Sequence, residues 1–137
     1  MTLEEVKKIK KDLLGFDPED ENECLGLEAV KQDGLNLSFV HDPTERICLA
    51  AVKENGWALA FVKDQTPEIC LAAVRENGLV IQFSELQTPE ICTEAVKNDP
   101  YALEFVKNQT PEICQAALDQ NDTAILFVKD LSMIVDE

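Results

Sequence analysis

The pentapeptide Thr-Pro-Glu-Ile-Cys occurs three times in this chain, beginning at Thr66, Thr88 and Thr110. The copies lie 22 residues apart, and the same period extends along the chain in both directions. It divides the sequence into five units, 22–43, 44–65, 66–87, 88–109 and 110–131. A fixed period of about 20–50 residues is the sequence signature of a stacked repeat architecture. The period therefore constrains the fold more than any other feature of the sequence.

Each unit predicts two short helices. Thr66 suits the N-cap of the first helix and Pro67 its first turn. We expect this helix to end at Asn77, with Gly78 in the left-handed conformation that closes many helices. The second helix, over 79–86 in this unit, is predicted to be partly 3₁₀.

Apolar residues recur at helical spacing in both helices and predict the core. In the first helix, Ile69, Cys70, Ala73 and Val74 form one apolar stripe. One position of the first helix is alanine in every unit: Ala29, Ala51, Ala73, Ala95 and Ala117. One position of the second helix is phenylalanine in every unit: Phe39, Phe61, Phe83, Phe105 and Phe127. It is accompanied by Leu37, Leu59, Ile81, Leu103 and Ile125. We expect all three ladders to be buried between stacked units, the alanines allowing close approach.

The two ends differ from the units. Residues 1–21 predict an N-terminal capping helix, whose apolar stripe should cover the open end of the stack, followed by an acidic loop or helix start. That stripe comprises Leu3, Val6, Ile9 and Leu13. Residues 132–137 are a short tail in which Ser132 to Val135 resemble the opening of a sixth unit. Together the segments predict one all-α domain, an α-solenoid of stacked two-helix repeats that forms a right-handed superhelix or a curved rod.

Charge and composition narrow the classes of partner and compartment. The net charge of −15 disfavours direct binding to nucleic acid, whose phosphates need basic side chains. No apolar run approaches the ~18 residues of a membrane span, and the charged N-terminus has no signal-peptide core. Five cysteines, an odd number, favour reduced thiols. We therefore expect a cytoplasmic protein, or one in a host-cell cytosol if the chain is viral or an effector.

The units resemble a known family on the segment PEICLAAVRENG followed by an apolar second helix with a fixed phenylalanine. This family is a domain-of-unknown-function family of tandem 22-residue helical repeats. The resemblance covers 22–131 and is strongest over 44–109. It implies the helical repeat fold and supplies no catalytic residue or ligand. The last unit departs from the pattern at Asp119, where the others have Lys or Arg, and at Asp122, in the glycine position.

Chemically active side chains give no convergent site. Cys48, Cys70, Cys92 and Cys114 occupy one repeat position, about 8–10 Å apart if each unit adds one helix layer. That spacing fits neither a disulfide nor a tetrahedral zinc site. Gly26 takes the same position in the first unit, so we expect small buried residues there, with Cys24 as the reactive thiol. His41 occupies a position that is otherwise charged and should be exposed. We assign no catalytic, cofactor or metal residue and predict that the chain is not an enzyme.

Candidate partner-binding residues lie where the units differ. The position after the turn holds Leu35, Trp57, Leu79 and Tyr101, either exposed or partly buried between layers. Leu27, Leu49 and Leu71 align along the first helices, as an exposed groove or in contact with the next layer. Glu68, Glu90 and Glu112 repeat near the helix starts.

These patterns support two functional hypotheses. The first is a non-enzymatic interaction or scaffold module that binds an unidentified protein through its solenoid surface. The alternative is an acidic inhibitor or nucleic-acid mimic that blocks a basic site on a partner, which salt should weaken steeply. Weak self-association through the C-terminal end is a further expectation.

Overall fold

The computed structural model describes residues 1–14 and 18–134 and contains only helices over those residues, so the expected all-α class is confirmed. The α-helices are α1 (Leu3–Leu14), α2 (Pro18–Gln32), α3 (Glu45–Glu54), α4 (Pro67–Glu76), α5 (Pro89–Asn98) and α6 (Pro111–Gln120). The 3₁₀-helices are η1 (Gly34–Phe39), η2 (Gly56–Phe61), η3 (Gly78–Phe83), η4 (Pro100–Phe105), η5 (Asp122–Phe127) and η6 (Leu131–Met133). In the described part of the chain, no helix is long and apolar enough to cross a membrane.

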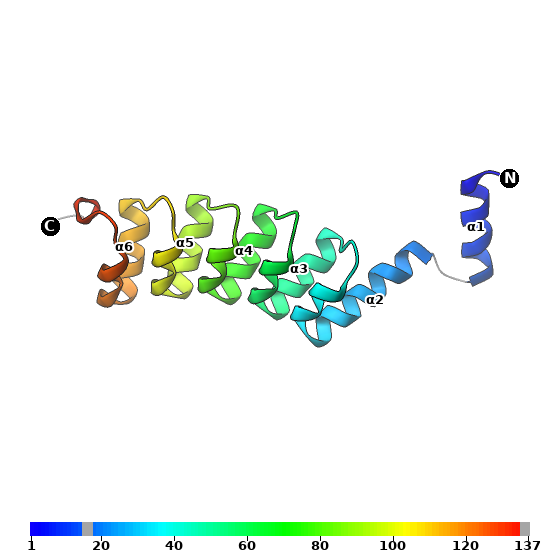
Figure 1. Ribbon diagram of the computed structural model, residues 1–137, viewed down its shortest axis with the longest axis horizontal. Helices are drawn as coiled ribbons and strands as arrows, with labels where there is room; N and C mark the ends of the chain where they lie inside the picture. The colour runs from blue at the N-terminus through cyan, green and yellow to red at the C-terminus, as the bar shows by residue number, and fades with distance from the viewer. Residues whose placement is uncertain (15–17, 135–137) are drawn as a thin grey trace.

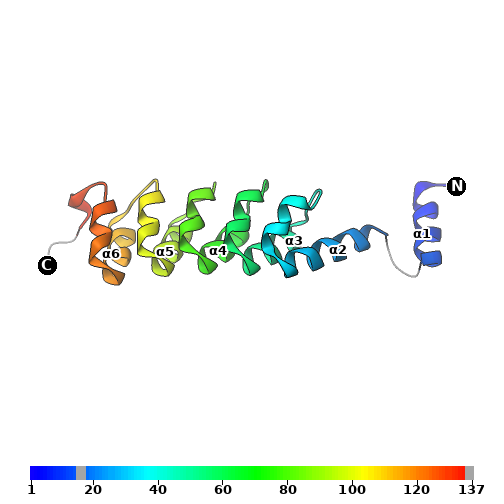
Figure 2. The ribbon, with the colours of Figure 1, turned by 60° about the horizontal axis from the view of Figure 1, so that its bottom comes forward.

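From α2 to η5, α-helices and 3₁₀-helices alternate along the chain. From α2 to α6 each α-helix packs against the next. Each of η1 to η4 packs against the α-helices on either side of it in sequence, and η5 packs against α6. Figures 1 and 2 show the result as a row of helix pairs with α1 standing apart at one end.

Side-chain caps set the helix boundaries in each unit. The Thr66 hydroxyl accepts a hydrogen bond from the Ile69 N–H at 3.3 Å, which caps the start of α4. The Asn77 N–H donates to the Ala73 carbonyl at 3.0 Å, and its side chain then accepts from the Leu79 N–H, also at 3.0 Å. One residue thus closes the α-helix with its backbone and caps the 3₁₀-helix with its side chain. The second helix is 3₁₀ over its whole length rather than in part.

The glycine after this turn has a different role from the predicted one. None of the four described glycines adopts the left-handed conformation, and the preceding Asn77 is extended, with φ −152°. Each turn glycine instead lies against the next unit: a Cβ on Gly56 would be 2.8 Å from the Ala73 carbonyl oxygen. Gly34 and Gly78 lie in the same way against the carbonyls of Ala51 and Ala95. These glycines permit close packing between units.

The first-helix stripe, the alanine ladder and the leucine and isoleucine ladder are buried with two exceptions. The stripe of Ile69, Cys70, Ala73 and Val74 is buried, as are its counterparts in α3 and α5. Leu37, Leu59, Ile81 and Leu103 are also buried. Ala29 is only half-buried and Ile125 is 40% exposed, because each lies at an end of the row.

The phenylalanine ladder was expected in the core, and that prediction is wrong. Phe39, Phe61 and Phe83 are 85%, 44% and 36% exposed, and Phe105 and Phe127 are half-buried. The two middle residues of η3, Val80 and Ile81, fill the core, and Phe83 follows them as the last residue of the helix. The phenylalanine therefore lies at the outer edge of the η layer.

The N-terminal segment also differs from expectation. Leu3, Val6, Ile9 and Leu13 are all exposed, so α1 does not cover the end of the row as predicted (Figure 1). Helix α2 already begins at Pro18, which makes the acidic stretch a helix start and places the expected boundary at residue 21 inside a helix.

At the other end, the tail does not begin an α-helix at Ser132. Asp130 caps the 3₁₀ turn η6 by accepting the Ser132 N–H at 2.9 Å, and Met133 packs against the core. Val135 lies outside the described residues.

Candidate interaction surface

The outer residues of η1 to η5 form one continuous set, here called the η surface. Three positions of each unit contribute: the residue after the turn, the phenylalanine, and the residue before the phenylalanine. They are Leu35, Ser38, Phe39, Trp57, Ala60, Phe61, Leu79, Gln82, Phe83, Tyr101, Glu104, Phe105, Thr123, Leu126 and Phe127. All fifteen are exposed or half-buried.

Aromatic rings on the η surface meet across consecutive units. Trp57 of η2 contacts Phe83 of η3 edge to face, with ring centroids 5.6 Å apart. Tyr101 of η4 contacts Phe127 of η5 in the same way at 5.7 Å. The predicted binding residues after the turn thus pair with phenylalanines that the sequence placed in the core. Phe39 belongs to the first unit and has no ring from a preceding unit against it, consistent with its high exposure.

The η surface is nearly uncharged in a strongly acidic protein. Glu104 is the only charged side chain among its fifteen residues, whereas charged residues are 28% of the whole chain. Apolar and aromatic side chains dominate the rest. A contiguous apolar and aromatic patch of this kind is typical of a protein-binding surface.

A polar cluster marks the C-terminal part of the η surface. The Tyr101 hydroxyl lies 2.8 Å from the Thr123 hydroxyl and accepts from the Asn121 side-chain amide at 3.3 Å. The Thr123 hydroxyl in turn donates to Asn121 at 2.7 Å. These bonds hold the Tyr101 ring in place, so its exposed face is a pre-organised contact point.

The other predicted binding residues lie on helices α2 to α6, here called the α layer, and they differ from the η surface in burial and charge. Leu27, Leu49 and Leu71 are half-buried and pack against the core, which favours contact with neighbouring layers over an exposed groove. Glu68, Glu90 and Glu112 are exposed in the first turns of their helices. A basic side chain follows on α4 (Arg75) and on α5 (Lys97), whereas α6 has none. Arg75 pairs with Glu94 of the next helix at 3.5 Å. The α layer therefore carries acidic residues at its helix starts and basic residues in the last turns of α4 and α5.

A ladder of glutamines, which the sequence analysis did not single out, joins the loops of successive units. The Gln87 side-chain amide donates to the Phe105 carbonyl at 3.0 Å, and its carbonyl accepts from the Lys107 N–H at 2.9 Å. Gln65 and Gln109 bond the following loop in the same way. The signal was present, since glutamine recurs at the last position of three consecutive units.

The cysteines are placed as predicted. Cys48, Cys70, Cys92 and Cys114 are buried, and Cys24 is exposed. Burial raises the pKa of all four buried thiols above the ordinary value, which keeps them protonated. The thiols of Cys70 and Cys114 lie 3.5 and 3.7 Å from the side-chain oxygens of Gln65 and Gln109, so they also support the glutamine ladder.

His41 is exposed, as predicted, and pairs with the equally exposed Asp42 at 3.3 Å. No cluster of potential metal ligands occurs in the segments that the structure describes.

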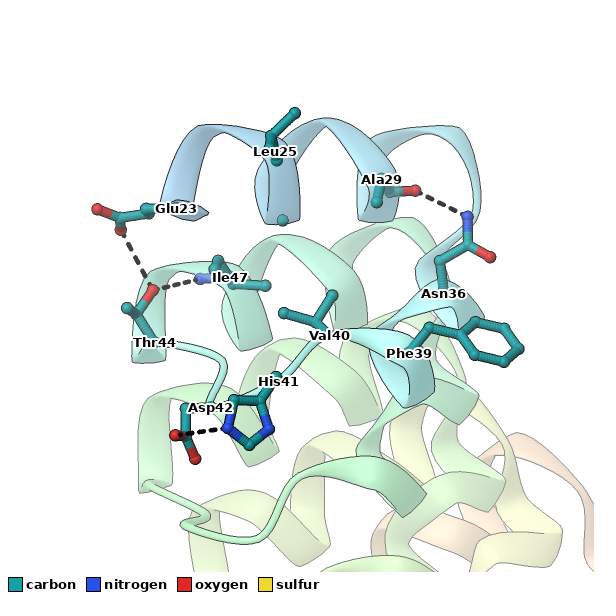
Figure 3. A pocket seen from close by; sticks show the side chains of 11 residues that line it. Glu23, Leu25, Ala29, Asn36, Phe39, Val40, His41, Asp42, Thr44 and Ile47 are labelled. Atoms are coloured by element: carbon teal, nitrogen blue, oxygen red, sulfur yellow. Dashed lines mark hydrogen bonds and ion pairs between the residues drawn. The ribbon is translucent and has the colours of Figure 1, made fainter. Parts of the chain in front are cut away.

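A hollow of about 800 Å³ opens at the N-terminal end of the row, between α2, η1 and the start of α3 (Figure 3). Leu25, Ala29, Val40 and Ile47 supply its apolar lining. Glu23 lies at its rim, where it accepts a hydrogen bond from the Thr44 hydroxyl at 3.2 Å.

Comparison with known proteins extends only to one family. Residues 66–110 match the family model described as a domain of unknown function, DUF4116. No curated protein and no solved structure matches the chain. The matched segment starts at Thr66 and ends at Thr110, so it spans two whole 22-residue periods and is similar to a domain of unknown function.

Proposed function

We propose that this chain is a non-enzymatic protein-binding module that holds its partner on the η surface. The observation that carries the proposal is the near absence of charge over fifteen exposed or half-buried residues in a protein of net charge −15. Apolar side chains left at a surface cost free energy in water, which a partner's apolar groups would relieve.

The architecture that suits this role is an α-solenoid of stacked two-helix repeats, curved or wound as a right-handed superhelix. In such an array each unit needs only its neighbours for stability, so outward positions are free to vary. The positions after the turn do vary, among leucine, tryptophan, tyrosine and threonine, while the buried positions repeat. A surface of this kind binds an elongated partner by several units at once.

The rings most suited to anchor a partner are Trp57 and Tyr101. Each is exposed on one side and held on the other by an edge-to-face contact with the next unit. A ring fixed before binding loses little conformational entropy on binding, which is why Trp and Tyr dominate binding energies at interfaces.

An acidic inhibitor that mimics nucleic acid is the second candidate, and the net charge of −15 is the observation in its favour. Its binding would rest on carboxylates such as Glu68, Glu90 and Glu112. The basic side chains Lys53, Arg75 and Lys97 on α3 to α5 count against it, because a phosphate-like row needs one sign throughout.

Affinity capture from the native host at low and high salt separates the two candidates. The η-surface proposal expects a partner that stays bound at high salt and is lost with Trp57→Ser or Tyr101→Ser. The matched control replaces Glu68, Glu90 and Glu112 with glutamine and should keep the partner. Loss of binding in that control, together with release by salt, would favour the acidic inhibitor instead.

A further inference from the structure

The end of the row formed by α2 and η1 leaves apolar side chains uncovered. In the 22-residue register, Leu25 corresponds to Ile47, Ile69, Ile91 and Ile113, which are all buried, yet Leu25 is 58% exposed. The hollow of about 800 Å³ lies beside it (Figure 3). We call Leu25, Ala29, Val40 and Ile47, with Glu23 and Asp42 at the rim, the head site.

Helix α1 carries a surface of the matching kind. Its stripe of Leu3, Val6, Ile9 and Leu13 is exposed, although the spacing of these residues is that of a buried helix face. The stripe is thus uncovered, as is Leu25 of the head site, where Ala29 and Val40 are half-buried and Ile47 is buried.

Charge also matches the two elements. The sequence of α1 holds four lysines against three carboxylates, so it is net positive, whereas α2 holds five carboxylates against one lysine. Glu23, one of these five, lies at the rim of the head site, and Asp42 adds a further carboxylate there. Opposite charges on two apolar surfaces favour their association and fix its orientation.

We propose that the head site binds α1 of a second copy of this chain, and that the two copies exchange this helix reciprocally. The exchange produces a closed, twofold dimer in which both stripes and both head sites are covered. The dimer uses the end of the row, where Phe39 of the η surface also lines the hollow, and it leaves η2 to η5 open. It does not depend on the proposed function of the η surface.

Stacking of the far end of another copy onto the head site is disfavoured. Between units, a turn glycine lies against the carbonyl of the next unit's alanine, as Gly56 does against Ala73. The last unit has Asp122 in that position. Its carboxylate would face the C-terminal carbonyls of the other copy's α2, which form the negative end of a helix dipole.

Sedimentation equilibrium of the full chain tests the exchange. The wild type should have twice the monomer mass at low salt, and the dimer fraction should fall as salt is added. Ile9→Glu and Leu25→Glu should each be monomeric alone. Mixed together they should form a heterodimer, because the Leu25→Glu copy offers an intact α1 and the Ile9→Glu copy an intact head site. Ala60→Glu, an exposed substitution in the middle of the row, should remain dimeric.

The proposal fails if the wild type stays monomeric at every concentration, or if the mixture never forms the heterodimer. Circular dichroism of each variant establishes that it is folded; the substituted side chains are exposed, so the helical signal should match that of the wild type.

A disulfide test identifies which copy supplies the helix. Cys24 is exposed one residue before Leu25, and the four other cysteines are buried. Ile9→Cys, treated with a mild oxidant, should give a chain linked to a second chain through Cys24, while Glu76→Cys should not. A disulfide formed within one Ile9→Cys chain would show that α1 folds onto its own head site and would overturn the exchange.

Discussion

The indole of Trp57 meets the phenyl ring of Phe83 edge to face, with centroids 5.6 Å apart and planes at 66°. The contact joins η2 to η3, so it couples two units through the same residues that form the η surface. An edge-to-face pair contributes about 0.5–1.5 kcal/mol beyond the area it buries.

A double-mutant cycle measures this coupling. Trp57→Leu and Phe83→Leu, alone and together, should show a coupling energy of about 0.5–1.5 kcal/mol in the free energy of unfolding by urea. Trp57→Leu combined with Phe127→Leu is the matched control, since η2 and η5 lie three units apart, and its effects should add. A Trp57–Phe83 cycle that is additive would mean that the rings stack without stabilising the row.

The turn glycines give a graded stability prediction. Gly78→Ala places a Cβ against the backbone carbonyl of Ala95, which cannot move without shifting a helix, and should cost about 1–3 kcal/mol or more. Gly26→Ala meets only the end of the Ile47 side chain, at 2.8 Å, and should cost less because that side chain can rotate. The thermal unfolding midpoint of Gly78→Ala should therefore lie below that of Gly26→Ala. Equal midpoints would contradict the role of Gly78 in close packing.

The glutamine ladder predicts a loss of stability that comes from hydrogen bonds rather than from apolar contacts. Gln87→Ala removes one hydrogen bond to the Phe105 carbonyl and one from the Lys107 N–H, and should destabilise the protein by about 1–3 kcal/mol. Gln82→Ala is the control: it is exposed, and its single bond stays within its own helix, so it should change stability by less than about 0.5 kcal/mol. Urea denaturation measures the free energy of unfolding of both variants. Equal losses would show that the glutamine ladder does not stabilise the protein.

The buried thiols link stability to alkaline pH. Burial raises the pKa of Cys70 and of its three ladder counterparts in the folded state, so the folded chain holds these protons more tightly than the unfolded chain. Their contribution to stability is complete below the ordinary thiol pKa of about 8.5 and is lost as pH rises through the folded value. Replacing the four cysteines with alanine should flatten this alkaline decline. If stability still declines as steeply at alkaline pH, groups other than these cysteines cause the decline.

Much of this architecture could be predicted from the sequence because its signals are local. Thr66 and Pro67 define a helix start by their own chemistry, and the spacing of Ile69, Cys70, Ala73 and Val74 identifies a buried face. Burial of the cysteine ladder could be predicted because Gly26 takes, in the first unit, the position that Cys70 takes in its own. A position that accepts both residues calls for a small side chain.

The errors arose where burial depends on packing between units. Phe83 repeats as regularly as Ile81, yet one is at the surface and the other in the core, because the period alone does not indicate which position faces a neighbouring unit. Gly78 was interpreted through its conformational freedom, whereas its role depends on a carbonyl in another unit. The apolar stripe of α1 predicted a buried face but could not indicate which surface covers it.

Site-specific photo-crosslinking tests the central claim, that the η surface binds a protein partner. A benzophenone side chain placed at Ala60 or Gln82, both exposed on the η surface, should crosslink the partner in the native host. The same group placed at Glu54 or Glu76, exposed at the ends of α3 and α4, should not. Crosslinks from Glu54 and Glu76 with none from Ala60 and Gln82 would contradict the account and place binding on the α layer.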